Sequence, residues 1–111
     1  MAGVEGTPDE EVESRSTLVI RAEAQAEIED VYRYYEDKAE GLGLDFLRAV
    51  EACLASIGRH PKMNAVLYKQ ARRGILRRFP YGLFYVLDQD HIEVIACFHA
   101  SRNPKEWHKR A

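Results

Sequence analysis

Apolar positions in residues 23–40 recur with the period of an α-helix. They are Ala24, Ile28, Val31, Tyr35 and Ala39, at successive steps of four, three, four and four residues. Such spacing places apolar side chains along one face of a helix. Charged residues, among them Asp30 and Asp37, occupy the other face, as a solvated helix surface requires. The pattern therefore predicts a first amphipathic helix.

A second helical stripe follows the sequence EGLGLD, whose two glycines favour a turn. Its members are Leu47, Val50, Leu54 and Ile57, widened by Phe46 and Cys53. Gly58 favours a helix C-terminus and Pro61 cannot continue a helix, so the second helix is predicted to stop near GRHP. Two amphipathic helices joined by a tight turn form an antiparallel hairpin.

The remaining apolar runs are typical of β-strands. STLVIRA precedes the helices, and GILRRF, LFYVL and IEVIACFH follow them. Pro80-Tyr81-Gly82 and residues 88–91 separate the last three runs, and both gaps have hairpin length and turn chemistry. The predicted order is β-α-α-β-β-β. This order indicates the α+β fold class, with a helical hairpin packed on a small antiparallel sheet.

Alternation along the last predicted strand divides its side chains between two faces. One face holds Ile92, Val94, Ala96 and Phe98, and the other holds Glu93, Ile95, Cys97 and His99. The preceding strand, LFYVL, is apolar on both faces. Because two helices cover only one face of a small sheet, the second face needs another cover. Two covers remain open: a partner protein, or the C-terminal segment folded back with Trp107 as its plug.

Composition narrows the class of protein. The chain has 111 residues, enough for one domain with a modest core, and is 46% hydrophobic and 31% charged. Residues 1–16 contain two glycines, a proline and five acidic residues but hardly any bulky apolar side chain. Such a segment cannot bury enough surface to order itself. We therefore expect a disordered acidic tail over residues 1–16 and a folded domain over residues 17–111.

No segment of the sequence predicts membrane insertion, export or metal binding. No apolar run approaches the ~20 residues that cross a bilayer, and the N-terminus lacks the layout of a signal peptide, so we expect a cytoplasmic protein. Cys53 and Cys97 lie within apolar patterns and are expected to be reduced and buried. The four histidines fit no metal template, and no metal or cofactor is predicted.

A net charge of −2 conceals an asymmetry between the two halves of the chain. Residues 1–59 hold six Lys/Arg against fourteen Asp/Glu, whereas residues 60–111 hold ten against four. The basic half is suited to an anionic ligand or to an acidic protein partner. The alternative is that the two halves of the folded domain neutralise each other.

The basic half concentrates its arginines around the predicted sheet. They are Arg72, Arg73, Arg77 and Arg78 in ARRGILRRFPYG, followed by His99 and Arg102 in HASR. Strand alternation predicts that Arg73 and Arg77 share one face, unless Gly74 marks a bulge. Arg72 and Arg78 would then occupy the other face. Guanidinium groups on neighbouring strands could converge with His99 into one cationic site for phosphate or carboxylate.

Three uses of such a site remain open. An RNA-cleaving site needs an acid, a base and cations for the phosphate. The candidates are His99 as acid or base, Arg102 with Arg73 or Arg78 as cations, and Tyr81 or Tyr85 as an assisting group. A binding surface needs only complementary charge, for which the same side chains serve. The third use is structural, with arginine stems covering the sheet edge and His99 capping its strand.

The stretch from Leu18 to the C-terminus resembles the RelE/ParE toxin superfamily of bacterial type II toxin–antitoxin systems. The resemblance rests on AEAQAEIEDVYRYYEDKA, GLGLDFLRAVEACLASIGRHP, RRGILRRFPYGLFYVL and HASRNPKEW. Within these segments, RRFPYGLFYV and the closing His-x-x-Arg-x-Pro-x-x-Trp are the more specific parts.

The resemblance implies a growth-inhibiting toxin that a cognate antitoxin holds inactive. In such pairs the C-terminal segment of the antitoxin wraps the toxin, and the complex binds operator DNA through the antitoxin. An acidic antitoxin segment would account both for an uncovered apolar face and for the basic second half of this chain.

Members of the superfamily differ in the target that they act on. RelE-like members cut mRNA on the ribosome with basic residues and a tyrosine near the C-terminus, whereas ParE-like members inhibit DNA gyrase. This chain lacks a lysine cluster before GILRRF, and its closing RNPKEWHKR contains no tyrosine. The resemblance therefore favours a ParE-like, plasmid-stabilisation type of toxin. A RelE-like mRNA endonuclease and a degenerate, non-toxic family member are the alternatives.

The sequence assigns no catalytic residue. The side chains expected to bind the target or the antitoxin are Arg73, Arg77, Arg78, His99, Arg102 and Trp107. If the chain were a nuclease, its catalytic candidates would be His99, Arg102, Arg73, Arg78 and Tyr81. The expected partners are the cognate antitoxin and either DNA gyrase or the ribosome, with no membrane.

Overall fold

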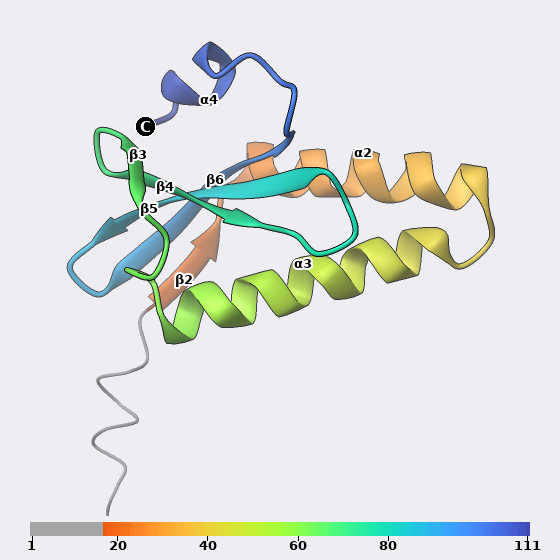
Figure 1. Ribbon diagram of the computed structural model, residues 1–111, viewed down its shortest axis with the longest axis horizontal. Coiled ribbons are helices and arrows are strands. Elements are labelled where there is room, and N and C mark those ends of the chain that lie inside the picture. The colour runs from red at the N-terminus through yellow and green to blue at the C-terminus, as the bar shows by residue number, and fades with distance from the viewer. Residues whose placement is uncertain (1–16) are drawn as a thin grey trace, which may run out of the picture.

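Two long helices and a five-stranded sheet dominate the part of the chain that the structure describes (Figure 1). This computed structural model describes residues 17–111, and the tail predicted over residues 1–16 lies outside the described residues. The elements are β2 (Thr17–Ile20), α2 (Ala22–Lys38), α3 (Leu42–Arg59), β3 (Val66–Tyr68), β4 (Ala71–Ile75), β5 (Tyr81–Asp88), β6 (His91–His99) and α4 (Lys105–His108). Among these residues, no helix has the length and apolar content needed to span a bilayer.

The sheet has the strand order β2-β6-β5-β4-β3. Strand β2 runs parallel to β6, and the other neighbours are antiparallel. The predicted α+β class is confirmed, but the sheet is mixed, because β2 joins it through the α2–α3 hairpin. A crossover of that length allows parallel pairing, whereas the short turns between the later strands allow only antiparallel pairing. The short elements β3 and α4 are additions to the predicted order.

The α2–α3 hairpin depends on a close turn. Gly41 has φ of 88°, a left-handed conformation that a side chain disfavours. The Glu36 carboxylate accepts the backbone N–H groups of Gly41 (3.0 Å) and Gly43 (2.9 Å), so α2 caps the start of α3. The predicted helix end near GRHP is confirmed, since α3 ends at Arg59 and His60 is its C-cap.

The main core lies between the helices and one face of the sheet. Its helical side includes Ala24, Ile28, Phe46, Val50 and Ile57, and its sheet side includes Leu83, Tyr85, Ile92 and Val94. Tyr85 is 0% exposed and carries the one polar group of this set. Its hydroxyl donates to the Pro61 carbonyl (2.7 Å) and accepts from the Asn64 amide (3.2 Å), which anchors the loop after α3.

A β-bulge at Ile95 reverses the alternation of β6. Phe84 pairs with Ala96 and Tyr85 pairs with Val94, so Ile95 has no partner on β5. The predicted face that joins Ala96 and Phe98 to Ile92 and Val94 is therefore wrong. Ala96 and Phe98 lie on the second face of the sheet, and Cys97 faces the helices.

Trp107 of α4 covers the second face. Its ring stacks on Phe84 with 4.5 Å between centroids, and the residue is 5% exposed. Around it lie Ala71, Ile95, Ala96 and Phe98. Of the two covers left open by the sequence, the chain's own C-terminal segment occupies this part of the sheet.

A charged clamp holds that segment in place. Arg110 forms a two-pronged ion pair with Glu27 on α2 (2.8 and 3.1 Å) and donates to the Ile95 carbonyl (2.8 Å). The Glu27 carboxylate also accepts the backbone N–H of Cys97 (3.0 Å). These bonds satisfy backbone groups of β6 beyond Val94, where β2 no longer pairs with it.

We expect Trp107→Ala to lower the free energy of unfolding by about 3–5 kcal/mol, the usual cost of removing a large buried aromatic ring. It should also increase binding of a hydrophobic dye, because Phe84 and Phe98 become exposed. Denaturant titration measures the first effect and dye fluorescence the second. Trp107→Phe should lose less, and Lys109→Ala, at an exposed neighbour, should match the parent protein. A Trp107→Ala protein as stable as the parent would contradict this role.

Candidate partner-binding groove

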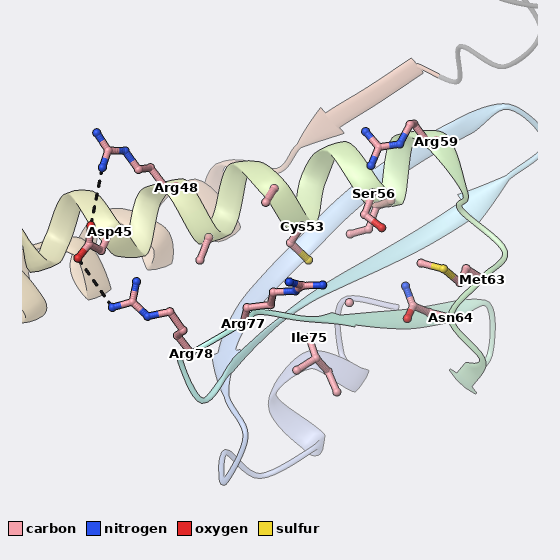
Figure 2. Close-up of a pocket in the computed structure, with 14 residues that line it drawn as sticks. Asp45, Arg48, Cys53, Ser56, Arg59, Met63, Asn64, Ile75, Arg77 and Arg78 are labelled. Atoms are coloured by element: carbon pink, nitrogen blue, oxygen red, sulfur yellow. Dashed lines mark ion pairs between the residues drawn. The ribbon is translucent and has the colours of Figure 1, made fainter.

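A groove of about 640 Å³ lies between α3 and the outer edge of the sheet (Figure 2). Its charged residues are Arg48 and Arg59 on α3, Arg77 and Arg78 after β4, and Asp45. Its floor contains Cys53, Ile57 and Gly74. Helix α3 thus supplies one wall of the groove and strand β4 the other.

Small residues make room for the groove. The side of α3 that faces it carries Ala49, Ala52, Cys53 and Ser56. Gly74 allows β4 to approach the helix at the floor: a Cβ atom there would lie 2.9 Å from the Cys53 sulfur and 3.1 Å from Ile57 Cδ1. The groove is therefore a consequence of residue size at the contact between α3 and β4.

The groove carries uncompensated positive charge. Its four arginines face a single carboxylate, Asp45, whose contacts with Arg48 (3.8 Å) and Arg78 (3.9 Å) are long. Arg59 and Arg77 make no ion pair with any residue of the described range 17–111. Figure 2 shows Arg77 extending into the space between α3 and β4. Arginine forks in this arrangement suit carboxylate or phosphate groups.

An open strand edge borders the groove. Strand β3 pairs with β4 only at Ala71 and Arg72, so within residues 17–111 the segment from Arg73 to Ile75 has no strand on its outer side. Ile75 is 66% exposed and Met63 is 62% exposed. An open edge flanked by exposed apolar side chains is a surface on which extended segments can add as strands.

The arginines predicted from the sequence lie in two places, around the groove and at the second face of the sheet. Strand β4 ends at Ile75, so Arg77 and Arg78 follow it in a turn, where Arg78 has φ of 73°. Their predicted placement on strand faces is therefore wrong. Arg72 donates to the carbonyls of Asn64 (2.6 Å) and Lys62 (3.3 Å), so it holds the loop that closes one end of the groove.

Arg73 and Arg102 lie at the second face of the sheet. Arg73 borders a small apolar pocket of about 120 Å³ that Phe84 and Phe98 also line. The Arg102 guanidinium lies 4.2 Å from the centre of the Phe98 ring and 3.9 Å from the Glu106 carboxylate. These two arginines therefore border one aromatic surface, apart from the groove.

His99 belongs to the helix-facing side of the sheet end. It pairs with Tyr81 across β5 and β6, and the two rings pack edge to face at 5.2 Å. Its Nδ1 atom accepts the backbone N–H of Ser101 at 3.0 Å. Tyr81 in turn packs against Phe46 in the main core. The predicted convergence of His99 with these arginines stays a prediction: the His99 ring packs on Tyr81, whereas Arg73 and Arg102 border Phe98.

Both cysteines pack in or against the main core. Burial raises the pKa of Cys53 to about 11 and that of Cys97 to about 12, so both thiols are protonated at neutral pH. Burial also raises the pKa of the Tyr81 phenol. Among the described residues, no three His, Cys, Asp or Glu side chains gather to hold a metal ion.

Sequence reasoning missed Arg48 and Arg59 as part of the basic surface. They lie on α3 eleven residues apart, close to three helical turns, so they project from similar sides of the helix. That spacing was available in the sequence. Their meeting with Arg77 and Arg78 was not, because it depends on how α3 packs against β4.

The helical hairpin on a mixed sheet defines a small α+β protein with a basic groove at its open sheet edge. The family model described as "ParE toxin of type II toxin-antitoxin system, parDE" matches residues 18–104. The chain therefore belongs to the ParE toxin family, and the resemblance seen in the sequence is confirmed.

A solved structure shows the same fold. The structure titled "Chromosomal ParDE TA system from P. aeruginosa" matches with a TM-score of 0.57 and 14% sequence identity, over 78% of this chain and 97% of that chain. At this identity the likeness shows the fold alone. A search of curated proteins found no match.

The floor of the groove yields a stability prediction. We expect Gly74→Ala to lower the free energy of unfolding by about 1–3 kcal/mol, because the added methyl group must displace Cys53 or Ile57 in a packed contact. Gly58→Ala, within α3, is the control: its Cβ would meet nothing within 4 Å. That control should not lower stability. Denaturant titration measures the free energy of unfolding of both variants. Equal effects would contradict the role of Gly74.

Proposed function

We propose that this protein is the toxin of a type II toxin–antitoxin pair and that an acidic segment of its cognate antitoxin binds the groove between α3 and β4. The observation that carries the proposal is the groove itself, where four arginines face one aspartate beside an open strand edge. Membership of the ParE toxin family supplies the kind of partner.

Charge and exposed apolar surface both support an acidic protein segment as the occupant. Carboxylates of the antitoxin pair with Arg59 and Arg77, which no described residue neutralises. Apolar side chains of the antitoxin cover Ile75 and Met63, and its backbone pairs with the edge from Arg73 to Ile75. In this proposal the complex forms in the cytoplasm and contacts operator DNA through the antitoxin alone.

The proposed action on the target is binding, with DNA gyrase as the target. A nuclease needs an acid or base within reach of cations that hold the phosphate. His99 packs on Tyr81, whereas Arg73 and Arg102 border Phe98 on the other face of the sheet. That separation supports a binding surface rather than a cleavage site. Cleavage of mRNA on the ribosome is the second candidate, and it would require His99 to act with a substrate that bridges both sides.

Binding of the cognate antitoxin tests the groove. We expect Arg59→Ala and Arg77→Ala each to weaken antitoxin binding about tenfold, equivalent to ~1.4 kcal/mol, because each removes a charge contact at the partner interface. Added salt should weaken the parent complex and reduce the difference between parent and variants. Titration calorimetry at two salt concentrations measures both effects.

The matched control for these variants is Arg33→Ala. Arg33 lies on α2 in an exposed ion pair with Asp30 (3.2 Å), outside the groove. Its removal should leave antitoxin affinity unchanged. Groove variants that bind the antitoxin as tightly as the Arg33→Ala protein would contradict the proposed binding site.

Two functional assays distinguish binding from cleavage. We expect the purified protein to inhibit supercoiling by gyrase and Arg73→Ala and Arg102→Ala to weaken inhibition by graded amounts. His99→Ala should weaken inhibition no more than the arginine changes do. If His99 were a catalytic acid or base, its loss would instead cost ~10²–10⁴-fold in rate. Cleavage of mRNA on translating ribosomes that disappears with His99→Ala would instead establish the second candidate.

A further inference from the structure

The acidic residues 1–16 belong to the same chain as the basic groove. They contain Glu5, Asp9, Glu10, Glu11 and Glu13 against Arg15, a net charge of −4. The groove carries four arginines and one aspartate, a net charge of +3. One chain therefore holds a strongly acidic segment and a groove of opposite charge.

The point of attachment allows the two to meet. Residue Thr17 starts β2, where its N–H donates to the Asp90 carbonyl at 2.9 Å. Figures 1 and 2 both show the start of β2 beside the C-terminal end of α3, the end that carries Arg59. A segment leaving Thr17 reaches the groove by rounding that helix end, which is roughly 10–12 Å across with its side chains.

The length of the segment is sufficient. Sixteen residues in extended form reach roughly 50 Å, whereas the 18 residues of α3 span about 27 Å. Residues 1–16 can therefore cross the helix end and still run beside the whole groove. A tether of this length holds its acidic groups at an effective concentration on the order of millimolar.

Four other arginines of the fold are already paired. Arg21, Arg33, Arg102 and Arg110 each have a carboxylate partner within the described residues, namely Glu93, Asp30, Glu106 and Glu27. In the groove, Arg59 and Arg77 have none within that range. The groove is therefore a place where unpaired positive charge lies within reach of the acidic segment.

We propose that residues 1–16 bind intramolecularly in the groove between α3 and β4 and compete there with the antitoxin. The binding is electrostatic and leaves the segment outside the hydrophobic core, in accord with its composition. It shields the arginines from other anions until the acidic segment of the antitoxin displaces it. The competition rests on the proposed function, whereas the intramolecular contact does not.

The contact is tested in the full chain without antitoxin. In one variant the five acids become amides: Glu5→Gln, Asp9→Asn, Glu10→Gln, Glu11→Gln and Glu13→Gln. Backbone amide shifts of this variant and the parent protein are compared by two-dimensional NMR at about 50 mM and about 0.5 M salt. We expect differences at Ser56, Gly74, Arg77 and Arg78 in low salt, which vanish in high salt.

A synthetic peptide of residues 1–16 provides the second arm. Added to the amide variant, it should shift the same groove signals, and it should fail to do so when Arg59→Gln and Arg77→Gln are also present. Arg33→Gln is the matched control and should leave the peptide effect intact. Differences confined to residues next to Thr17, or centred on another basic surface, would overturn the proposal.

Antitoxin binding by the amide variant distinguishes this inference from the proposed function. The amide variant should bind the cognate antitoxin about threefold to tenfold more tightly than the parent in low salt, because its competitor is weakened. If the groove arginines matter for the antitoxin but the acids leave the groove signals unchanged, only the inference fails. If the groove signals respond but the arginine variants bind antitoxin normally, only the proposed function fails.

Discussion

The β-bulge at Ile95 is the constraint on which both faces of the sheet depend. By adding one residue to β6 opposite β5, it directs Cys97 toward the helices and Ala96 and Phe98 to the second face. Beyond Val94, β6 is no longer paired with β2, and its buried backbone groups there must find other partners. The Glu27–Arg110 pair supplies them, and in doing so fixes the segment that carries Trp107 over Phe84.

The opposite edge of the sheet, along β4, is left open because few residues pair with it. Strand β3 pairs with β4 at only two of its positions, and small residues on α3 leave space above Gly74. The turn after β4 then places Arg77 and Arg78 beside that space, where Arg48 and Arg59 project from the helix. The proposed binding of an antitoxin depends on this arrangement, with a stable core on one side and an unfilled basic groove on the other.

The two halves of the chain partly neutralise each other, and the remainder is localised. Arg110 and Glu93 in the second half pair with Glu27 and Arg21 in the first. Hydrogen bonding to Arg21 lowers the pKa of the Glu93 carboxyl below its ordinary value near 4.5, so this pair is charged at neutral pH. The sequence left two explanations of the charge asymmetry, neutralisation between the halves and a basic surface for an acidic partner. Each explanation applies to a different set of residues. Pairing accounts for the clamp, whereas excess positive charge accounts for the groove.

The sequence by itself determined the helices, the hairpin-linked strands β5 and β6, and the α+β class, because these follow from local periodicity and turn residues. It also indicated the family, through segments such as RRFPYGLFYV. Only the tertiary structure decided the bulge at Ile95, the end of β4 before Arg77, the burial of Trp107 and the meeting of Arg59 with Arg77. Each of these depends on how segments distant in the chain pair or pack, and periodicity within one segment carries no information about its partner's register.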